Sequence, residues 1–500
     1  MLTLSVRQAN ALELAADVVV LGTWTLSAKK GKTSIIDALE RAFGGGGAFE
    51  KAFAKEEFTG KRDQTLVIPS LGRIAPQKVI VIGLGDRDSA GPAEIRTFAA
   101  KAARLANAER AKTATVSLPE GLETKLRIVA EGLELGAYRF THYLSGDRKP
   151  KEALESVTLV VERKAPADAK KALAAGQAVA AGVCIARDLS NEPPNVIYPE
   201  SFAAVAVKIA KEHKLKVTVI DDKEIEKRGM WLLHAVGRGS SHKPRLVHLS
   251  YVPAKKAKKK ICFVGKGITF DSGGLSIKPA QGMGEMKHDM SGAANVVGLM
   301  AAIAALKPNV EVHAVAALAE NMPDGNAYRP GDIWGSLDGK FVEITNTDAE
   351  GRLILADALT YAAKEIEPDL LIDNATLTGA CVVALGATYS GWYASNEATA
   401  TSFQSALKQA GETMWRLPLI EELREQLKSD CADLKHTGDR FGGSITAALF
   451  LREFIGKTKN WVHADIAGPS AADRPHLWHG KGATGHAVLT FLALVERASK

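Results

Sequence analysis

The chain reads FVEITNTDAEGRLILADALTYAAKEI at residues 341–366, and this stretch decides its predicted fold class. A short apolar run at residues 341–345 is typical of a buried strand. Beyond an acidic turn, Leu355, Leu359 and Ile366 repeat at the spacing of an amphipathic helix over residues 353–366. A strand that leads directly into a helix is the building unit of an α/β fold.

The same alternation of strands and helices continues on both sides of this stretch. Further strands are predicted at residues 216–220, 245–252, 261–265, 310–318, 370–377 and 461–466, with helices at residues 202–213 and 293–306. Such alternation favours parallel strands joined by crossover helices. We therefore predict an α/β protein of two domains, each a mixed, mostly parallel sheet flanked by helices. In this architecture, functional sites lie at the carboxyl ends of strands.

The predicted domain boundary lies near residue 165. The preceding part mixes short strands, such as residues 78–83 and 157–162, with Ala-rich helical stretches. An Ala-rich helical segment then runs from about Ala165 to Leu189 and stops before Pro193 and Pro194, since proline cannot continue a helix. We predict an N-terminal α/β domain at residues 1–165, a connecting helix at 166–190 and a larger C-terminal domain at 191–500.

Composition excludes several classes of protein. Of 500 residues, 46% are hydrophobic and 24% charged, which excludes intrinsic disorder. A net charge of +7 is too small for a chain of this length to imply nucleic-acid binding by itself. The four cysteines lie far apart and are expected to be reduced thiols. The N-terminus lacks the pattern of a signal peptide, and the longest apolar stretch, residues 293–306, is shorter than a membrane span of ~20 residues. We predict a cytoplasmic protein without a membrane partner.

Charged residues that could do chemistry gather at three predicted strand–helix junctions. The first carries Lys266, Asp271 and Lys278, the second Asp289, and the third Asp348, Glu350 and Arg352. Asp348 and Glu350 are two residues apart, so in extended backbone their carboxylates would face the same side. Four carboxylates carry a charge that matches two divalent cations, and burying them without metal would be very costly.

These segments resemble the leucyl (cytosol) aminopeptidase family of two-metal exopeptidases. The run NTDAEGRL at residues 346–353 reproduces the signature octapeptide of that family, and VGKGITFDSGG at residues 264–274 matches equally well. Similarity continues through Met286, Lys287, Asp289 and Met290, then residues 375–380, His463 with residues 465–468, and residues 481–485. The resemblance covers roughly residues 185–490, and it is weak over the first 165.

The resemblance implies a site with two adjacent divalent cations. Lys266, Asp271, Asp289 and Glu350 would ligate one cation, and Asp271, Asp348 and Glu350 the other. Because neither Cys nor His is among these ligands, Mn²⁺ or Mg²⁺ compete plausibly with Zn²⁺ or Co²⁺. Lys278 would stabilise the oxyanion, and Arg352 would hold a bicarbonate that serves as general base. The resemblance also implies a homohexamer and peptide substrates with a free N-terminus.

Several features depart from the family pattern. His288 stands beside a predicted ligand, Asn295 and Asn374 occupy normally apolar positions, and the insert at residues 469–480 is rich in His and Trp. A further hypothesis adds DNA binding to catalysis, because residues 255–260 read KKAKKK and the isoelectric point is about 9.0. No recognisable nucleic-acid-binding motif supports that hypothesis. The Asp271-Ser272-Gly273 triplet occurs once, whereas an aspartic protease needs two such carboxylates.

Overall fold

The structure is a computed structural model that describes residues 1–25, 34–162 and 164–500. The chain divides into two compact units. Met1–Ala181 and Pro475–Gly480 form the N-terminal unit, whereas Gly182–Arg474 and Lys481–Lys500 form the C-terminal unit. The long helix α5 (Ala169–Asn191) covers the segment predicted as a connector, and the division between the units falls inside it.

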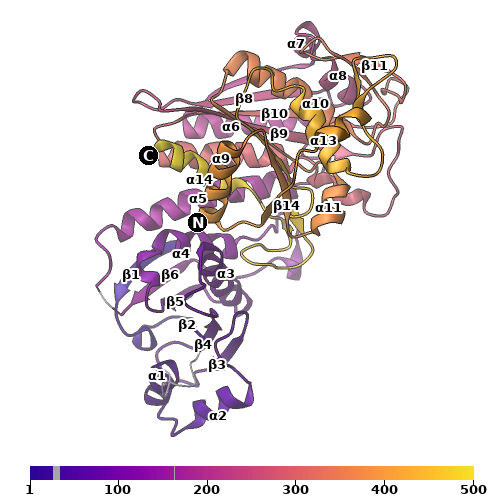
Figure 1. Cartoon of the computed structure of the whole chain (residues 1–500). Helices are drawn as coiled ribbons and strands as arrows, with labels where there is room; N and C mark the ends of the chain where they lie inside the picture. Colours follow the sequence, from indigo (N-terminus) through magenta and orange to yellow (C-terminus); the bar gives the residue numbers. More distant parts are fainter. Residues whose placement is uncertain (26–33, 163) are drawn as a thin grey trace. The chain divides into compact units, whose positions relative to one another are not determined.

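The N-terminal unit is built around a six-stranded sheet with the order β1-β6-β5-β2-β4-β3 (Figure 1). Every neighbouring pair is parallel except β3 with β4. The strands are β1 (Thr3–Gln8), β2 (Val18–Thr23), β3 (Thr65–Pro69), β4 (Lys78–Gly83), β5 (Thr113–Ser117) and β6 (Ser156–Val161), and the helices are α1 (Ser34–Phe43), α2 (Ala48–Lys55), α3 (Pro92–Ala108) and α4 (Leu126–Ala137).

Alternation along β2 shows why helices cover both faces of this sheet. Val18 and Val20 belong to the core that includes residues of α3 and α4, whereas Val19 and Leu21 belong to the core that includes residues of α1 and α2. Successive side chains of a strand point to opposite faces, so a continuous apolar run needs cover on both.

The C-terminal unit contains an eight-stranded sheet with the order β15-β14-β17-β13-β9-β10-β8-β7. Its four central strands, β17, β13, β9 and β10, run parallel, and antiparallel pairs lie outside them. The strands are β7 (Lys216–Ile220), β8 (Arg245–Tyr251), β9 (Lys260–Asp271), β10 (Glu311–Asn321), β13 (Leu370–Ala375), β14 (Ser390–Ala394), β15 (Met414–Arg416) and β17 (Trp461–Asp465). The predicted α/β class with two mixed, mostly parallel sheets is confirmed.

Helices pack on the C-terminal sheet in two groups. One group contains α6 (Pro199–His213), α9 (Ser291–Leu306), α12 (Glu397–Ala410) and α14 (Val488–Ser499), and the other contains α8 (Trp231–Gly237), α10 (Glu350–Tyr361) and α13 (Gly443–Arg452). The short helices α7 (Asp222–Lys227) and α11 (Gly379–Leu385) and the end of α5 from Gly182 on also belong to this unit. A continuous apolar core joins α8, α10 and α13 to the strands beneath them. This layer holds α10 against the sheet and so positions the residues at the start of that helix.

The strand of residues 341–345 differs from its prediction. It forms as the short β12 (Phe341–Glu343), but it lies outside the main sheet. β12 pairs instead with β11 (Ile333–Gly335) and β16 (Leu434–Lys435) in a separate three-stranded sheet. The acidic turn before α10 is therefore not the end of a strand of the main sheet. It is held next to that sheet because α10 packs on β9 and β10.

Two described stretches are long and apolar enough to cross a membrane by composition alone, Ala169–Asn191 and Met283–Leu306. Half of the apolar window of the first and 83% of that of the second are buried inside the protein. Core helices pass the same test, so neither stretch is by itself a sign of a membrane span.

Candidate metal centre

The charged residues singled out in the sequence lie together in the C-terminal unit. Lys266 belongs to β9 and Asp271 is its last residue, whereas Asp289 lies two residues before the start of α9. Glu350 is the first residue of α10, and Asp348 lies in the turn before it. One strand, the loop after it that carries Lys278, and the beginnings of two helices thus supply the charged side chains of this centre.

Two lysines hold the four carboxylates in two groups. Lys266 Nζ lies 2.9 Å from Asp289 Oδ1 and 2.9 Å from Glu350 Oε1. Lys278 Nζ lies 2.8 Å from Asp271 Oδ2 and 2.5 Å from Asp348 Oδ1. Lys266, Asp271, Asp289 and Glu350 are all buried, so little solvent screens these charges. Four acids against two bases leave an excess of negative charge.

The donor set fits divalent cations. One carboxylate oxygen from each of Asp271, Asp348 and Glu350 can be chosen so that all lie within 4.8 Å of one another. Asp289 Oδ2 and Glu350 Oε2 are buried and have no hydrogen-bond partner among the described residues. Buried polar atoms are normally satisfied, and buried carboxylate oxygens left open in this way are suited to bind a metal ion.

The turn before α10 corrects one expectation from the sequence. Asp348 and Glu350 do not lie on extended backbone, because Asn346 folds the chain back on itself. The Asn346 side-chain oxygen accepts a hydrogen bond from the Asp348 N–H at 2.9 Å. The backbone carbonyl of Asn346 accepts another from the Ala349 N–H at 3.2 Å. Asparagine favours such turns because its side chain replaces a backbone acceptor. The turn and the helix start, rather than strand geometry, bring the two carboxylates together.

Burial and mutual repulsion shift the pKa values of the acids. Burial, with the charge of Glu350 next to it, raises the pKa of Asp271 to about 6. Burial also raises the pKa of Asp289 well above its usual value. For Glu350 burial acts in the same direction, but the charges of Lys266 and Lys278 outweigh it and lower the pKa. Paired titratable groups with displaced pKa values are typical of functional sites.

A glycine permits the close approach of α10 to Lys266. A Cβ on Gly351 would lie 2.5 Å from Cε of Lys266 and 2.7 Å from its Nζ. Such distances are far below van der Waals contact, so any side chain at this position would displace the lysine. Glycine between Glu350 and Arg352 therefore gives Lys266 room to reach Glu350.

Arg352 lies in the first turn of α10 with a free donor. Its Nη1 donates to the His436 carbonyl at 2.9 Å, whereas its Nε is buried without a hydrogen-bond partner in the part of the chain that the structure describes. Burial lowers the pKa of Arg352 to about 10, opposed by the charge of Glu350. A buried guanidinium with an unused N–H is suited to bind a small anion.

Residues 375–380 and 465–468 are among the matching motifs of the sequence but were assigned no role from it, and the structure shows that they support this centre. The Thr376 carbonyl accepts a hydrogen bond from Lys266 Nζ at 2.8 Å, and its hydroxyl donates to Asp289 Oδ1 at 2.7 Å. Asp465 in turn accepts from the Leu377 N–H at 3.2 Å and from the Thr378 hydroxyl at 2.6 Å. Thr376 follows β13 directly, so the rule that sites lie at the carboxyl ends of strands could have indicated it.

The residues that depart from the family pattern have structural partners. His288 Nδ1 lies 3.2 Å from Ser190 Oγ, and Asn295 donates to Asn374 Oδ1 at 3.3 Å and to the His486 carbonyl at 2.6 Å. Part of the insert, Pro475–Gly480, belongs to the N-terminal unit, where Trp478 is buried under the guanidinium of Arg96 at 4.8 Å.

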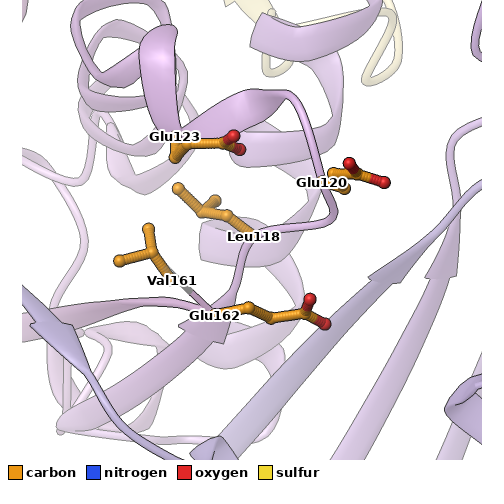
Figure 2. A pocket seen from close by; sticks show the side chains of 5 residues that line it. All are labelled: Leu118, Glu120, Glu123, Val161 and Glu162. Carbon is orange, nitrogen blue, oxygen red and sulfur yellow. The ribbon is translucent and has the colours of Figure 1, made fainter. Parts of the chain in front are cut away.

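A pocket in the N-terminal unit also carries acidic side chains. Figure 2 shows its lining, Leu118, Glu120, Glu123, Val161 and Glu162, near the carboxyl ends of β5 and β6. Its volume of about 10 Å³ leaves room for roughly one water molecule. The Gly121 N–H donates to Glu123 at 2.7 Å, and Glu120 pairs with Arg87 at 3.3 Å. Two of the three acidic side chains of the pocket therefore have partners within the protein, and no ligand is needed to explain them.

Comparisons with known proteins find relatives of both units of the chain. Residues 184–492 match the model of the cytosol aminopeptidase family, catalytic domain, and residues 20–147 match that of its N-terminal domain. A probable cytosol aminopeptidase of Aquifex aeolicus is 43% identical over 89% of each chain, and one of Alkaliphilus oremlandii is 41% identical over 98% of each. Among solved structures, a tomato leucine aminopeptidase mutant superposes with a TM-score of 0.89 at 33% identity, covering 99% of this chain and 97% of its own. The bottromycin maturation enzyme BotP in complex with Mn superposes with a TM-score of 0.84 at 35% identity, covering 97% and 100%.

Proposed function

Since the chain belongs to the cytosol aminopeptidase family and is a metallo-aminopeptidase, we propose that it removes leucine and other N-terminal residues from peptides at a pair of divalent cations. Lys266, Asp271, Asp289 and Glu350 would hold one cation, and Asp271, Asp348 and Glu350 the other. The open, buried oxygens of Asp289 and Glu350 beside the Asp271–Asp348–Glu350 group support this proposal most directly.

Mn²⁺ is the first candidate for the cation. The proposed ligands are four carboxylates and one amine, and carboxylate oxygen suits Mn²⁺. The related BotP structure is described as a complex with Mn. When bound there, divalent cations would supply Lewis acidity and a water molecule activated for nucleophilic attack. Lys266 must lose its proton to offer a lone pair, so cation binding here displaces a proton.

Lys278 and Arg352 have separate roles in the proposed reaction. Lys278 keeps its proton, because the charges of Asp271 and Asp348 outweigh the effect of burial and raise its pKa. Its ammonium would stabilise the negative charge that develops on the carbonyl oxygen of the scissile bond. Arg352 would bind bicarbonate through its free Nε–H, and bicarbonate held there would supply a general base.

Metal removal tests the proposed function. Protein treated exhaustively with chelator is expected to lose its ability to release the N-terminal residue from Leu-, Ala-, Arg- and Cys-Gly-type peptides. Adding Mn²⁺, Zn²⁺, Co²⁺ or Mg²⁺ separately is expected to restore activity to different degrees, and elemental analysis gives the number of ions bound per chain. Full activity in protein shown to be metal-free would contradict the two-cation site.

Cellular location and assembly complete the proposal. Relatives named cytosol aminopeptidase support a cytoplasmic location for this chain. The family resemblance supports a homohexamer. The substrates of the protein would be peptides with a free N-terminus.

A further inference from the structure

The pairing of β9 with β10 is irregular immediately before the metal centre. Ile268 lies opposite Ala319, but the next recorded pair joins Asp271 to Asn321, so β9 has one more residue than β10 in this interval. In regular pairing Phe270 would lie opposite Asn321. A β-bulge of this kind re-aims a side chain, and bulges are frequent next to active sites. Here the bulge places a predicted metal ligand beside an asparagine.

Asn321 connects two segments that carry predicted ligands. Its Nδ2 lies 2.8 Å from Asp271 Oδ1 and 2.9 Å from the Thr347 carbonyl oxygen. The carbonyl can only accept, and so can an ionised carboxylate, so the amide group of Asn321 donates both hydrogen bonds. The side chain is fully buried, and its backbone carbonyl accepts hydrogen bonds from the N–H and the hydroxyl of Ser272.

Further hydrogen bonds join the same two segments. The Tyr328 hydroxyl donates to the Thr347 carbonyl at 2.7 Å, beside Asn321. The Thr347 hydroxyl donates to the Gly273 carbonyl at 2.6 Å and accepts from the Ser276 N–H at 2.7 Å. Thr347 directly precedes Asp348, so these bonds fix the chain that carries Asp348 against the chain that carries Asp271.

The amide of Asn321 has little freedom to rotate. Its Oδ1 is buried without a hydrogen-bond partner among the residues that the structure describes. The same oxygen lies only 2.8 Å from the place where a Cβ on Gly274 would stand. The carboxamide is therefore packed against Gly274, and exchanging its oxygen and nitrogen would set Oδ1 against two acceptors. This packing keeps the amide group directed at Asp271 and Thr347.

We propose that Asn321 is a positioning residue that sets the separation of Asp271 and Asp348, and with it the affinity of the protein for divalent cations. This inference rests on the proposed two-cation site. Asn321 acts through Asp271 and through Thr347, whose carbonyl it shares with Tyr328. Partners behind the metal ligands orient those ligands, and their loss typically lowers metal affinity about 10- to 100-fold.

Calorimetric titration of Mn²⁺ into chelator-stripped, full-length protein tests the proposal. Asn321→Ala is expected to weaken Mn²⁺ binding about 10- to 100-fold, and Tyr328→Phe less, by up to about tenfold, because one of two bonds to Thr347 remains. The matched control is Asn374→Ala. Asn374 is also a fully buried strand residue, but its amide donates to the Val264 carbonyl at 3.2 Å inside β9, and neither to a proposed ligand side chain nor to the Thr347 carbonyl. The control is expected to keep wild-type affinity.

Other measurements separate positioning from general stability. At saturating Mn²⁺, Asn321→Ala is expected to lower kcat for a Leu peptide while KM changes little, because the Asn321 side chain is fully buried behind the proposed ligands. Wild-type Mn²⁺ affinity in folded Asn321→Ala, or an equal loss in Asn374→Ala, would overturn the proposal. If circular dichroism shows that Asn321→Ala is unfolded, the proposal is tested with Tyr328→Phe instead. Wild-type affinity for Mn²⁺ in Tyr328→Phe then overturns the proposal. Absence of Mn²⁺ binding by the wild-type protein would refute the two-cation site itself.

Discussion

At the scale of single residues, charge compensation organises the metal centre. Each lysine of the centre contacts two carboxylates, and each pair combines residues far apart in the chain. Lys266 is fully enclosed, whereas Lys278 keeps 19% of its side chain accessible. This difference agrees with their separate proposed roles, one as a ligand and the other in contact with substrate.

Lys278→Ala separates catalysis from metal binding. Turnover of a Leu peptide is expected to fall about 10²- to 10³-fold, because a donor to the developing oxyanion is lost. KM is expected to change much less than kcat. Metal content, measured by elemental analysis, is expected to stay at the wild-type value. Near-normal turnover in folded, metal-loaded Lys278→Ala would show that this lysine has no part in the reaction.

The buried imidazole of His436 is expected to make the protein less stable in mild acid. Its Nε2 lies 2.9 Å from the Asn346 carbonyl oxygen, and its Nδ1 lies 3.3 Å from the Thr345 nitrogen and 3.2 Å from the Glu343 carbonyl oxygen. Burial, with the charge of Arg352, lowers its pKa to about 4. An unfolded His titrates near pH 6.5, so between about pH 6.5 and 4 only the unfolded chain binds this proton. The contribution of His436 to stability is therefore complete above pH 6.5 and is lost as the pH falls.

Urea unfolding at pH 7.5 and 5.0 measures this effect. The full loss for His436 is on the order of 3 kcal/mol by pH 4, and part of it is expected at pH 5.0. His436→Gln keeps a donor for the Asn346 carbonyl but does not titrate, so its stability is expected to fall less between the two pH values. Equal losses in the wild-type protein and the variant would contradict the assignment.

At the scale of elements, close backbone contact joins α5 and α9 within the C-terminal unit. A Cβ on Gly298 would lie 2.2 Å from the Gly182 carbonyl oxygen, and one on Gly182 would lie 2.5 Å from the Gly298 carbonyl oxygen. The two helices cross where neither has a side chain. Because Asp289 lies two residues before α9, this crossing also supports the metal centre.

Gly298→Ala is expected to destabilise the protein despite the higher helix propensity of alanine. Propensity favours alanine by about 1 kcal/mol, whereas forcing apart two packed backbones costs about 1 to 3 kcal/mol, so the net effect is expected to be unfavourable. Scanning calorimetry is expected to show a lower unfolding temperature. Gly284→Ala is the control, because a Cβ there would meet nothing within 4 Å. An unchanged or raised transition in Gly298→Ala would exclude the close crossing.

At the scale of the whole molecule, the number of chains in the assembly can be measured directly as a mass in solution. The proposed homohexamer of this 53.2-kDa chain has a mass of about 320 kDa. Light scattering coupled to size-exclusion chromatography is expected to give that value across a tenfold range of concentration. A constant mass near that of one chain would refute the hexamer without affecting the assignment to the family.

The sequence by itself determined the α/β class and most side chains of the candidate centre. Both depend on local signals: apolar runs that end in glycine, acids at strand–helix junctions, and motifs that keep ligands at fixed short spacings. These signals marked Asp271, Asp289, Asp348 and Glu350 as a group of acids at strand–helix junctions, and the resemblance of their segments to the family motifs assigned them as ligands.

Only the tertiary structure decided which segments meet. It excluded β12 from the main sheet, replaced an extended backbone by a turn at Asn346, and inserted the bulge that pairs Asp271 with Asn321. Asn321 lies 50 residues from Asp271, and His436 lies 84 residues from Arg352. Contacts over such separations depend on strand order, register and helix packing, which arise from the packing of the whole unit rather than from any short stretch of sequence.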